Sequence, residues 1–248
     1  MGFVIGIDEV GRGSLAGPVV VCAALVPRAL SLVTRHTSLR LRDSKQLTRN
    51  QREKWFAHLT AHPKIRFALA KVYPKTIDRI NISQAANLAA FRAFHRLTKS
   101  SKLKAHSYSV YLDGGLYLGN NRLGRSLSFP PALTRRGRRR RESRFTLDPR
   151  VKPEDDNQKY FAKTIVRADE TIPAVSIASI IAKVTRDRLM VRLAKKHPHY
   201  GFEVHKGYGT LRHRRAIKKH GPSKAHRLTF LDFLKNSKPK RRNFSRKS

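Results

Sequence analysis

Two short apolar runs near the start of the chain, residues 3–8 and 18–27, constrain its fold more than any other feature. Both are rich in β-branched residues, and a glycine-rich turn separates them, which is the pattern of two neighbouring strands in one sheet. The first run ends on two acids, Asp8 and Glu9. A strand that ends on two negative charges in a strongly basic chain needs a chemical explanation.

The charge balance points to a polyanionic partner. The chain has 54 Lys and Arg against 16 Asp and Glu, a net charge of +38, and nucleic acid is the default partner of such a field. No apolar run approaches the roughly 20 residues of a membrane-spanning helix, no secretory signal pattern is present, and Cys22 is the only cysteine. We therefore expect a cytoplasmic protein that has no membrane association and is a monomer, since like charges repel.

Alternation and helical spacing predict further strands and helices along the chain. A helix with a cap at Thr48 is predicted over residues 47–62, and a second helix over 83–100 with Ala85, Leu88, Ala89, Phe91 and Leu97 on its inner face. Further strands are predicted over 66–74, 108–115 and 160–170, and further helices over 173–197, from Thr210, and over 225–234.

Two segments cannot bury much apolar surface. Residues 117–158 include the charge block "TRRGRRRRESR" and the turn-rich stretch "LDPRVKPEDD", and residues 236–248 form a basic tail. We expect one catalytic domain over residues 1–235, interrupted by a basic, disordered insertion at about 117–158 and followed by a disordered tail.

Three acids occupy corresponding places at the ends of predicted strands. Asp8 and Asp113 each end an apolar strand and lead into glycine-containing turns, and Asp169 follows the run "KTIV" by a few residues. If these strands are neighbours, the acids, with Glu9, meet at one edge of the sheet and repel one another unless a cation neutralises them. Oxygen ligands favour Mg²⁺ or Mn²⁺, and a pair of such ions is the usual clamp for phosphodiester hydrolysis.

Competing motifs are weaker. The segment from Gly11 to Ala16 fits a dinucleotide-binding glycine pattern, but it leads through Pro18 into a strand instead of a helix. Asp187 lies four residues after Lys183, so a helical ion pair explains it. A zinc site is also disfavoured, because no cysteine accompanies the histidines and their spacing matches no common site; we expect solvated or phosphate-contacting side chains at His197, His199, His205 and His213.

With these residues in place, the chain resembles bacterial ribonuclease HII, a type 2 ribonuclease H. The resemblance rests on five ordered motifs: "GIDEVGRGSLAGPVV", "DSKQLT", "YLDGG", "SIASIIAKVTRD" and "HKGYGT…HGPSKAHRLTF". It implies an α/β ribonuclease H-like fold, a mixed five-stranded sheet flanked by helices with a C-terminal helical extension. It also implies metal-dependent endonucleolytic hydrolysis of RNA in RNA/DNA hybrids, including incision 5′ of a single ribonucleotide in duplex DNA, which leaves 3′-hydroxyl and 5′-phosphate ends.

The resemblance also assigns residues to roles. It implies that the metal-binding, catalytic acids are Asp8, Glu9, Asp113 and Asp169. The loop of Gly11, Arg12 and Gly13 would recognise the ribonucleotide, Tyr208 would pack on the sugar of the following deoxynucleotide, and Lys45 would lie near the substrate backbone.

Three departures from the family pattern stand out. Gly115 replaces an asparagine after the third acid, Ala168 replaces a glycine before the fourth, and the insertion lies between those two acids. Three alternatives stay open at this point: a ribonuclease HIII, a non-catalytic nucleic-acid-binding protein, and an enzyme whose site the insertion blocks. A replication-machinery partner, and the choice between Mg²⁺ and Mn²⁺, are also left open by the sequence.

Overall fold

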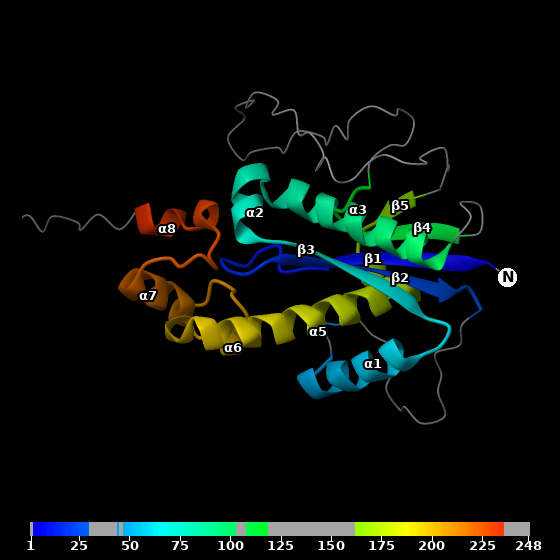
Figure 1. Cartoon of the computed structure of the whole chain (residues 1–248), viewed down its shortest axis with the longest axis horizontal. Helices are drawn as coiled ribbons and strands as arrows, with labels where there is room; N and C mark the ends of the chain where they lie inside the picture. Colours follow the sequence, from blue (N-terminus) through cyan, green and yellow to red (C-terminus); the bar gives the residue numbers. More distant parts are fainter. Residues whose placement is uncertain (1, 30–43, 45–46, 103–107, 119–161, 236–248) are drawn as a thin grey trace, which may run out of the picture.

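The computed structural model describes residues 2–29, 44, 47–102, 108–118 and 162–235. These residues form a five-stranded sheet in the order β3-β2-β1-β4-β5, with helices packed on both faces (Figure 1). The strands are β1 (Phe3–Val10), β2 (Val19–Pro27), β3 (Arg66–Val72), β4 (Tyr108–Asp113) and β5 (Ala162–Ile165).

The sheet is mixed, and its parallel part carries the acids. Strand β1 is central and pairs antiparallel with β2 and parallel with β4, while β4 pairs parallel with β5. Strand β2 is buried along nearly its whole length, as expected of a β-branched run covered on both faces. The expected mixed five-stranded sheet is therefore confirmed, and β1, β4 and β5 are neighbours as the acid pattern requires.

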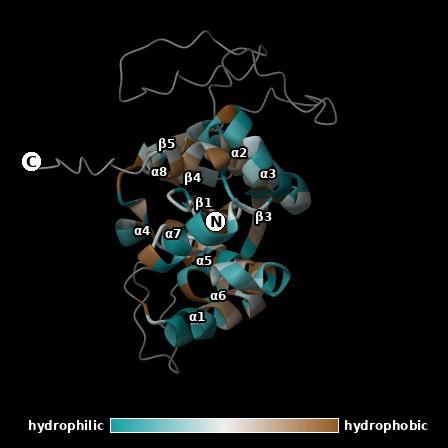
Figure 2. Cartoon of the chain, turned by 90° about the vertical axis from the view of Figure 1, so that its left-hand side faces the viewer, coloured by the Kyte–Doolittle hydropathy of each residue, from teal (hydrophilic) through white to brown (hydrophobic). Residues whose placement is uncertain are grey.

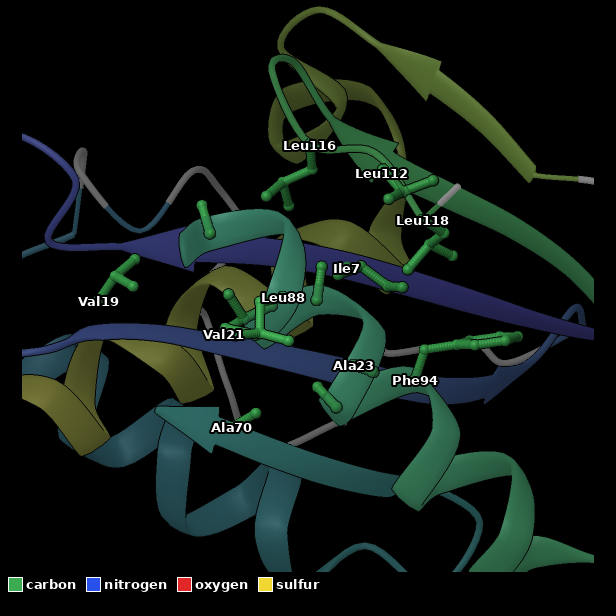
Figure 3. Packing of buried hydrophobic residues seen from close by; sticks show 14 of the residues in the cluster. Ile7, Val19, Val21, Ala23, Ala70, Leu88, Phe94, Leu112, Leu116 and Leu118 are labelled. Atoms are coloured by element: carbon green, nitrogen blue, oxygen red, sulfur yellow. The ribbon is translucent and has the colours of Figure 1, made fainter. Parts of the chain in front are cut away.

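Helices cover the two faces unequally. The helix α3 (Ile82–Ser101) packs on one face, and α1 (Arg49–Ala61) and α5 (Pro173–Lys196) pack on the other (Figure 1). Side chains from α3 meet those of β1, β2 and β4 in a continuous apolar core in which Ile7, Val21 and Leu88 lie together (Figure 3).

Close packing of α5 against β1 depends on Gly6. A Cβ at this position would lie 2.1 Å from the backbone carbonyl carbon of Ala174, at the start of α5. Backbone atoms cannot move aside as a flexible side chain can, so only glycine permits this helix to approach the central strand. The close contact fixes α5 beside the strand that ends in Asp8.

The C-terminal elements form a separate small layer at the end of α5. They build a third apolar cluster with Leu15 and Met190, and α7 shows a largely hydrophilic surface (Figure 2). This layer places the turn that carries Tyr208 beside the loop that follows β1. Its members are η2 (Pro198–Tyr200), α6 (Phe202–His205), α7 (Leu211–His220), η3 (Leu228–Phe230) and α8 (Asp232–Lys235).

Helix starts with polar caps agree with the predictions. Thr48 caps α1 in a reciprocal capping box with Gln51, and Thr210 caps α7. Two predictions about helices are wrong. The segment 225–234 forms η3 and α8 instead of one helix, and Phe91 is only partly buried, stacked on His95.

The structure also contains elements that the sequence did not predict, and part of the chain lies outside the described residues. Two short helices, α2 (Pro74–Ile80) and α4 (Ala168–Thr171), were not predicted. Most of the expected insertion lies outside the described residues, as does the tail, but Leu118, near the start of the predicted insertion, is buried in the main core together with the preceding Leu116. No helix in the described part of the chain has both the length and the apolar character needed to cross a bilayer.

Candidate active site

The structure brings the acid-bearing strand ends together. Asp8 and Asp113 each lie one residue beyond the paired Ile7 and Leu112 of the parallel strands β1 and β4. Because side chains alternate along a strand, these two acids lie side by side on the face covered by α5. Asp169 follows β5, in the short helix α4, and is buried.

Asp8 lies in an environment that strongly disfavours its charge. Burial raises the pKa of its carboxyl well above the usual range, and the negative charges of Glu9 and Asp113 raise it further. Hydrogen bonds from Ser179 of α5 and from the Glu9 amide, 2.7 Å from Oδ1, act in the opposite direction. Asp8 is thus a buried carboxylate among other carboxylates, an arrangement that a cation would stabilise.

The fourth acid is tied to the third through the backbone. The amide of Ala168 donates to Asp113 Oδ1 at 2.9 Å, and Ser176 Oγ donates to the Asp169 carbonyl at 2.5 Å. Asp169 is therefore anchored between the end of β4 and the first turns of α5. Since Ala168 donates through its amide, the replacement of glycine at this position does not interfere with the contact.

Glu9 is paired with the arginine of the glycine-flanked loop. Arg12 Nε lies 3.1 Å from Glu9 Oε1, and Arg12 Nη2 donates to the Gly115 carbonyl at 3.0 Å. Gly115 has a φ of +89°, and a Cβ there would meet Arg12 Nη1 at 2.7 Å. The glycine that replaces the family asparagine thus leaves room for Arg12, which was predicted to belong to the loop that recognises the ribonucleotide and here contacts an acid.

The four acids do not surround a common metal position in this structure. Within the described ranges, no three or more His, Cys, Asp or Glu side chains are arranged to hold a metal ion. The donor chemistry nevertheless suits a hard divalent cation, because the acids offer only carboxylate oxygens and Asp8 is buried beside two further negative charges.

Two buried arginines hold the loop after β1, and sequence reasoning missed both. Arg227 is fully buried and donates four hydrogen bonds, to the carbonyls of Gly11, Arg12 and Gly17. Burial lowers the pKa of Arg227 to about 9, and repulsion from Arg186 contributes. No carboxylate in the described part of the chain lies within ion-pair distance of this guanidinium, so its partners are backbone dipoles.

Arg186 joins the same loop to the turn that carries Tyr208. Its guanidinium donates to the carbonyls of Ala16 and Pro18, and also to that of Lys206 at 3.0 Å. The Leu15 amide donates to the Gly207 carbonyl at 2.8 Å, which adds a direct backbone link. The glycine-flanked loop and the tyrosine turn are therefore one connected unit.

The remaining predicted contact residues are less uniform. Tyr208 is 36% exposed, and its ring lies 5.7 Å from Lys183 Nζ, so it can meet a ligand from solvent. Lys45 lies outside the described residues. Its neighbour Ser44 is buried and shares a 2.7 Å hydrogen bond with Ser179 of α5, which also bonds Asp8, so Ser44 itself lies near that acid.

The histidine prediction is partly wrong. His205 and His213 are buried and stacked on each other, and His213 contacts a third buried histidine, His226.

Two other predictions about competing motifs are confirmed. Asp187 pairs with Lys183 at 3.1 Å, and Pro18 leads into a strand.

The hydrogen bonds define which ring nitrogen carries each proton. The Ser223 amide donates to His226 Nδ1 at 2.9 Å, so His226 is protonated on Nε2 and donates to His213 Nε2 at 3.1 Å. His213 then carries its proton on Nδ1 and donates to the Tyr208 carbonyl at 2.9 Å. Burial lowers the pKa of His213 and of His226 to about 4, which agrees with neutral rings.

Comparison with solved structures first gives the class. A ribonuclease H2 from Pyrococcus horikoshii superimposes with a TM-score of 0.61 at 25% identity, covering 92% of this chain and 93% of that one. A Bst ribonuclease HIII in complex with Mn²⁺ gives 0.60 at 21% identity, covering 94% and 68%, a likeness of fold. The sheet order and the likeness to the Pyrococcus enzyme therefore place this chain in the ribonuclease H class of endonucleases.

Sequence comparison then gives the family. The chain belongs to the ribonuclease HII family, because the model of that family matches residues 5–116 and 146–233. A ribonuclease HII from Nitratidesulfovibrio vulgaris is 37% identical over 225 residues, which are 91% of this chain and 84% of that protein. The unmatched residues 117–145 fall inside the insertion that we predicted to extend to about 158.

Proposed function

We propose that this ribonuclease H endonuclease cuts RNA in RNA/DNA hybrids and incises duplex DNA on the 5′ side of a single embedded ribonucleotide. One observation carries the proposal. The acids of β1 lie at the start of the glycine-flanked loop, with Asp113 of β4 beside Asp8, and that loop is bonded through Leu15 and Gly207 to the turn of Tyr208. Catalytic and recognition groups thus belong to one unit.

The loop and the tyrosine of this unit have different roles in recognising the substrate. The glycine-flanked loop offers backbone groups that a ribose 2′-hydroxyl can approach closely at Gly13, which is exposed and has no Cβ. The missing Cβ of Gly11 instead leaves room for the buried side chain of Arg186 behind the loop. The exposed ring of Tyr208 packs on the sugar of the next deoxynucleotide and so tests for a missing 2′-hydroxyl. Together they select the junction between RNA and DNA, and the incision leaves 3′-hydroxyl and 5′-phosphate ends.

The four acids Asp8, Glu9, Asp113 and Asp169 would hold two divalent ions, Mg²⁺ or Mn²⁺. Such ions, when bound, lower the pKa of an attacking water and stabilise the charge on the leaving oxygen. Asp8 stands at the centre, between Glu9 in its own strand and Asp113 in the next. In this structure the Glu9 carboxylate is paired with Arg12. For Glu9 to bind a divalent ion, Arg12 must leave this carboxylate and would then pair with a phosphate of the substrate.

The test is incision of labelled duplexes with one ribonucleotide, with an RNA strand, or with DNA alone, in Mg²⁺, Mn²⁺ or EDTA. The wild type should give one metal-dependent cut 5′ of the ribonucleotide and no cut in DNA. Asp8→Asn should slow incision by about 100-fold or more, the loss of several kcal/mol of transition-state stabilisation, and should still bind the duplex.

The matched control is Glu170→Gln, which removes an exposed carboxylate one residue from Asp169 and should cut like the wild type. Tight binding of every duplex with no cut in either metal would contradict the proposal and leave the blocked-enzyme alternative. Cytoplasmic location and a monomeric state stay predictions from the sequence.

A further inference from the structure

A cavity of about 260 Å³ lies between α1 and the second half of α5. Figure 1 shows these two helices side by side on the face of the sheet opposite α3. Its lining includes five basic side chains and two acidic ones. The cavity is therefore electropositive and is separate from the acids of the active site. The basic members are Arg49 and Arg52 of α1, Arg188 and Arg192 of α5, and Lys206 at the end of α6.

The two acids of this basic cavity are already neutralised. Glu53 pairs with Arg188 at 2.5 Å, and Asp187 pairs with Lys183 at 3.1 Å. Arg52 is also committed, because it donates to the backbone carbonyls of Ser44 and Leu47. The positive charge of the cavity that these contacts do not compensate lies on its other three basic side chains.

Three cations remain without an acidic partner. Among the described residues, no carboxylate lies within ion-pair distance of Arg49, Arg192 or Lys206, although Lys206 donates to the Glu203 carbonyl. Burial lowers the pKa of Lys206, and the charges of Arg49 and Lys183 lower it further against the effect of Asp187. Cations that repel one another around a cavity form a site that an anion would stabilise.

The basic cavity adjoins the turn that meets the substrate. Lys206 is two residues before Tyr208, and Lys183, the ion-pair partner of Asp187, lies 5.7 Å from the Tyr208 ring. The basic cavity is therefore within reach of a duplex whose deoxynucleotide packs on Tyr208. A phosphodiester group with its water shell fits this volume. The anions closest to the cavity would be the next phosphates of the same duplex.

We propose that the basic cavity binds one backbone phosphate of the duplex on the 3′ side of the ribonucleotide, through Arg49, Arg192 and Lys206. This rests on the proposed function, because it assumes that Tyr208 contacts the deoxynucleotide after the ribonucleotide. The contact reads no sequence and serves to position the flanking duplex. It makes the length of duplex beyond the junction a determinant of affinity.

The test compares Arg49→Gln/Arg192→Gln with the matched control Lys54→Gln/Lys196→Gln. Both pairs remove two exposed cations from the same two helices, but the control pair lies outside the basic cavity. Binding of a ribonucleotide-containing duplex is measured by fluorescence anisotropy in EDTA over a range of salt concentrations. The cavity variant should lower the slope of log affinity against log salt by about 0.9, the value for one phosphate, and the control should not.

Duplex length tests the placement. Shortening the flank 3′ of the ribonucleotide from about 12 to about 3 base pairs should weaken wild-type binding and remove the difference between the two variants. An equal slope loss in both variants, or a difference that follows the 5′ flank, would overturn the inference.

Incision assays separate this inference from the proposed function. With wild-type incision present, the cavity variant should raise KM several-fold at unchanged kcat, since it lies away from the acids. If the protein cuts no duplex but the cavity variant still changes the salt slope of binding in a way that depends on the 3′ flank, the phosphate site is supported and the proposed nuclease activity is contradicted.

Discussion

Acidification from about pH 8 to about pH 5 is expected to destabilise this protein through His213 and His226. Both rings are buried, at 0% and 2% exposure, and each has a pKa of about 4 against an ordinary value of 6.5. The unfolded chain therefore takes up protons below pH 6.5 while the folded chain does not. Stability is full above pH 6.5 and is lost as the pH falls from 6.5 toward 4.

The loss can be estimated from these values. At pH 5 one such histidine costs up to about 2 kcal/mol, because one pKa unit is worth about 1.36 kcal/mol. The two rings share a hydrogen bond, so their costs are not independent, and a combined loss of about 2–4 kcal/mol is expected. That is a large part of the 5–15 kcal/mol typical of a folded protein.

Urea unfolding at several pH values measures this loss, and the single tryptophan, buried Trp55, is a natural fluorescence probe. His226→Gln keeps a hydrogen-bond donor for His213 but cannot titrate, so it should flatten the pH dependence by about one proton. His199→Gln, at an exposed histidine, is the matched control and should keep the wild-type dependence.

Histidine NMR titration gives the direct check. Two rings should stay neutral well below pH 6 in the folded protein. If every histidine titrates near 6.5, or if His226→Gln leaves the pH dependence of stability unchanged, the reasoning from burial is refuted.

Two further predictions concern stability. Gly6→Ala should cost about 3 kcal/mol or more in urea unfolding, because the new Cβ meets the α5 backbone, whereas Gly13→Ala, with nothing within 4 Å, should cost far less; equal losses would contradict the close-packing argument. Arg227→Lys should cost about 3–5 kcal/mol in thermal unfolding, because lysine cannot bond the three carbonyls that the guanidinium fork reaches, and a wild-type melting temperature would count against this role.

The parts of the fold that were predictable follow from local rules. Apolar β-branched runs predicted β1 and β2, a side-chain cap predicted the start of α1 at Thr48, and a helix was predicted to start near Thr210, where α7 begins. The acids could be found because a strand that ends in a carboxylate is uncommon in so basic a chain. Their tie through the Ala168 amide depends on the path of the chain after β5, which no local pattern encodes.

The parts that could not be predicted depend on contacts between distant segments. Arg186 and Arg227 look like two more of 54 basic residues, yet both are buried because loop carbonyls turn toward them. His213 and His226 likewise become buried only when α7 packs on the loop after it. The break between α2 and α3 falls at Asn81, which adopts a φ of +66° without a glycine or proline to announce it.

The buried Arg227 also sets the direction of the peptide groups in the loop. In a planar trans peptide the C=O and the following N–H point in opposite directions. Since Arg227 draws the carbonyls of Gly11 and Arg12 inward, the amides of Arg12 and Gly13 must face outward. One interior cation thus turns a short stretch of backbone into a pair of donors aimed at solvent, and the ribose oxygen of the proposed substrate would meet dipoles already oriented before it arrives.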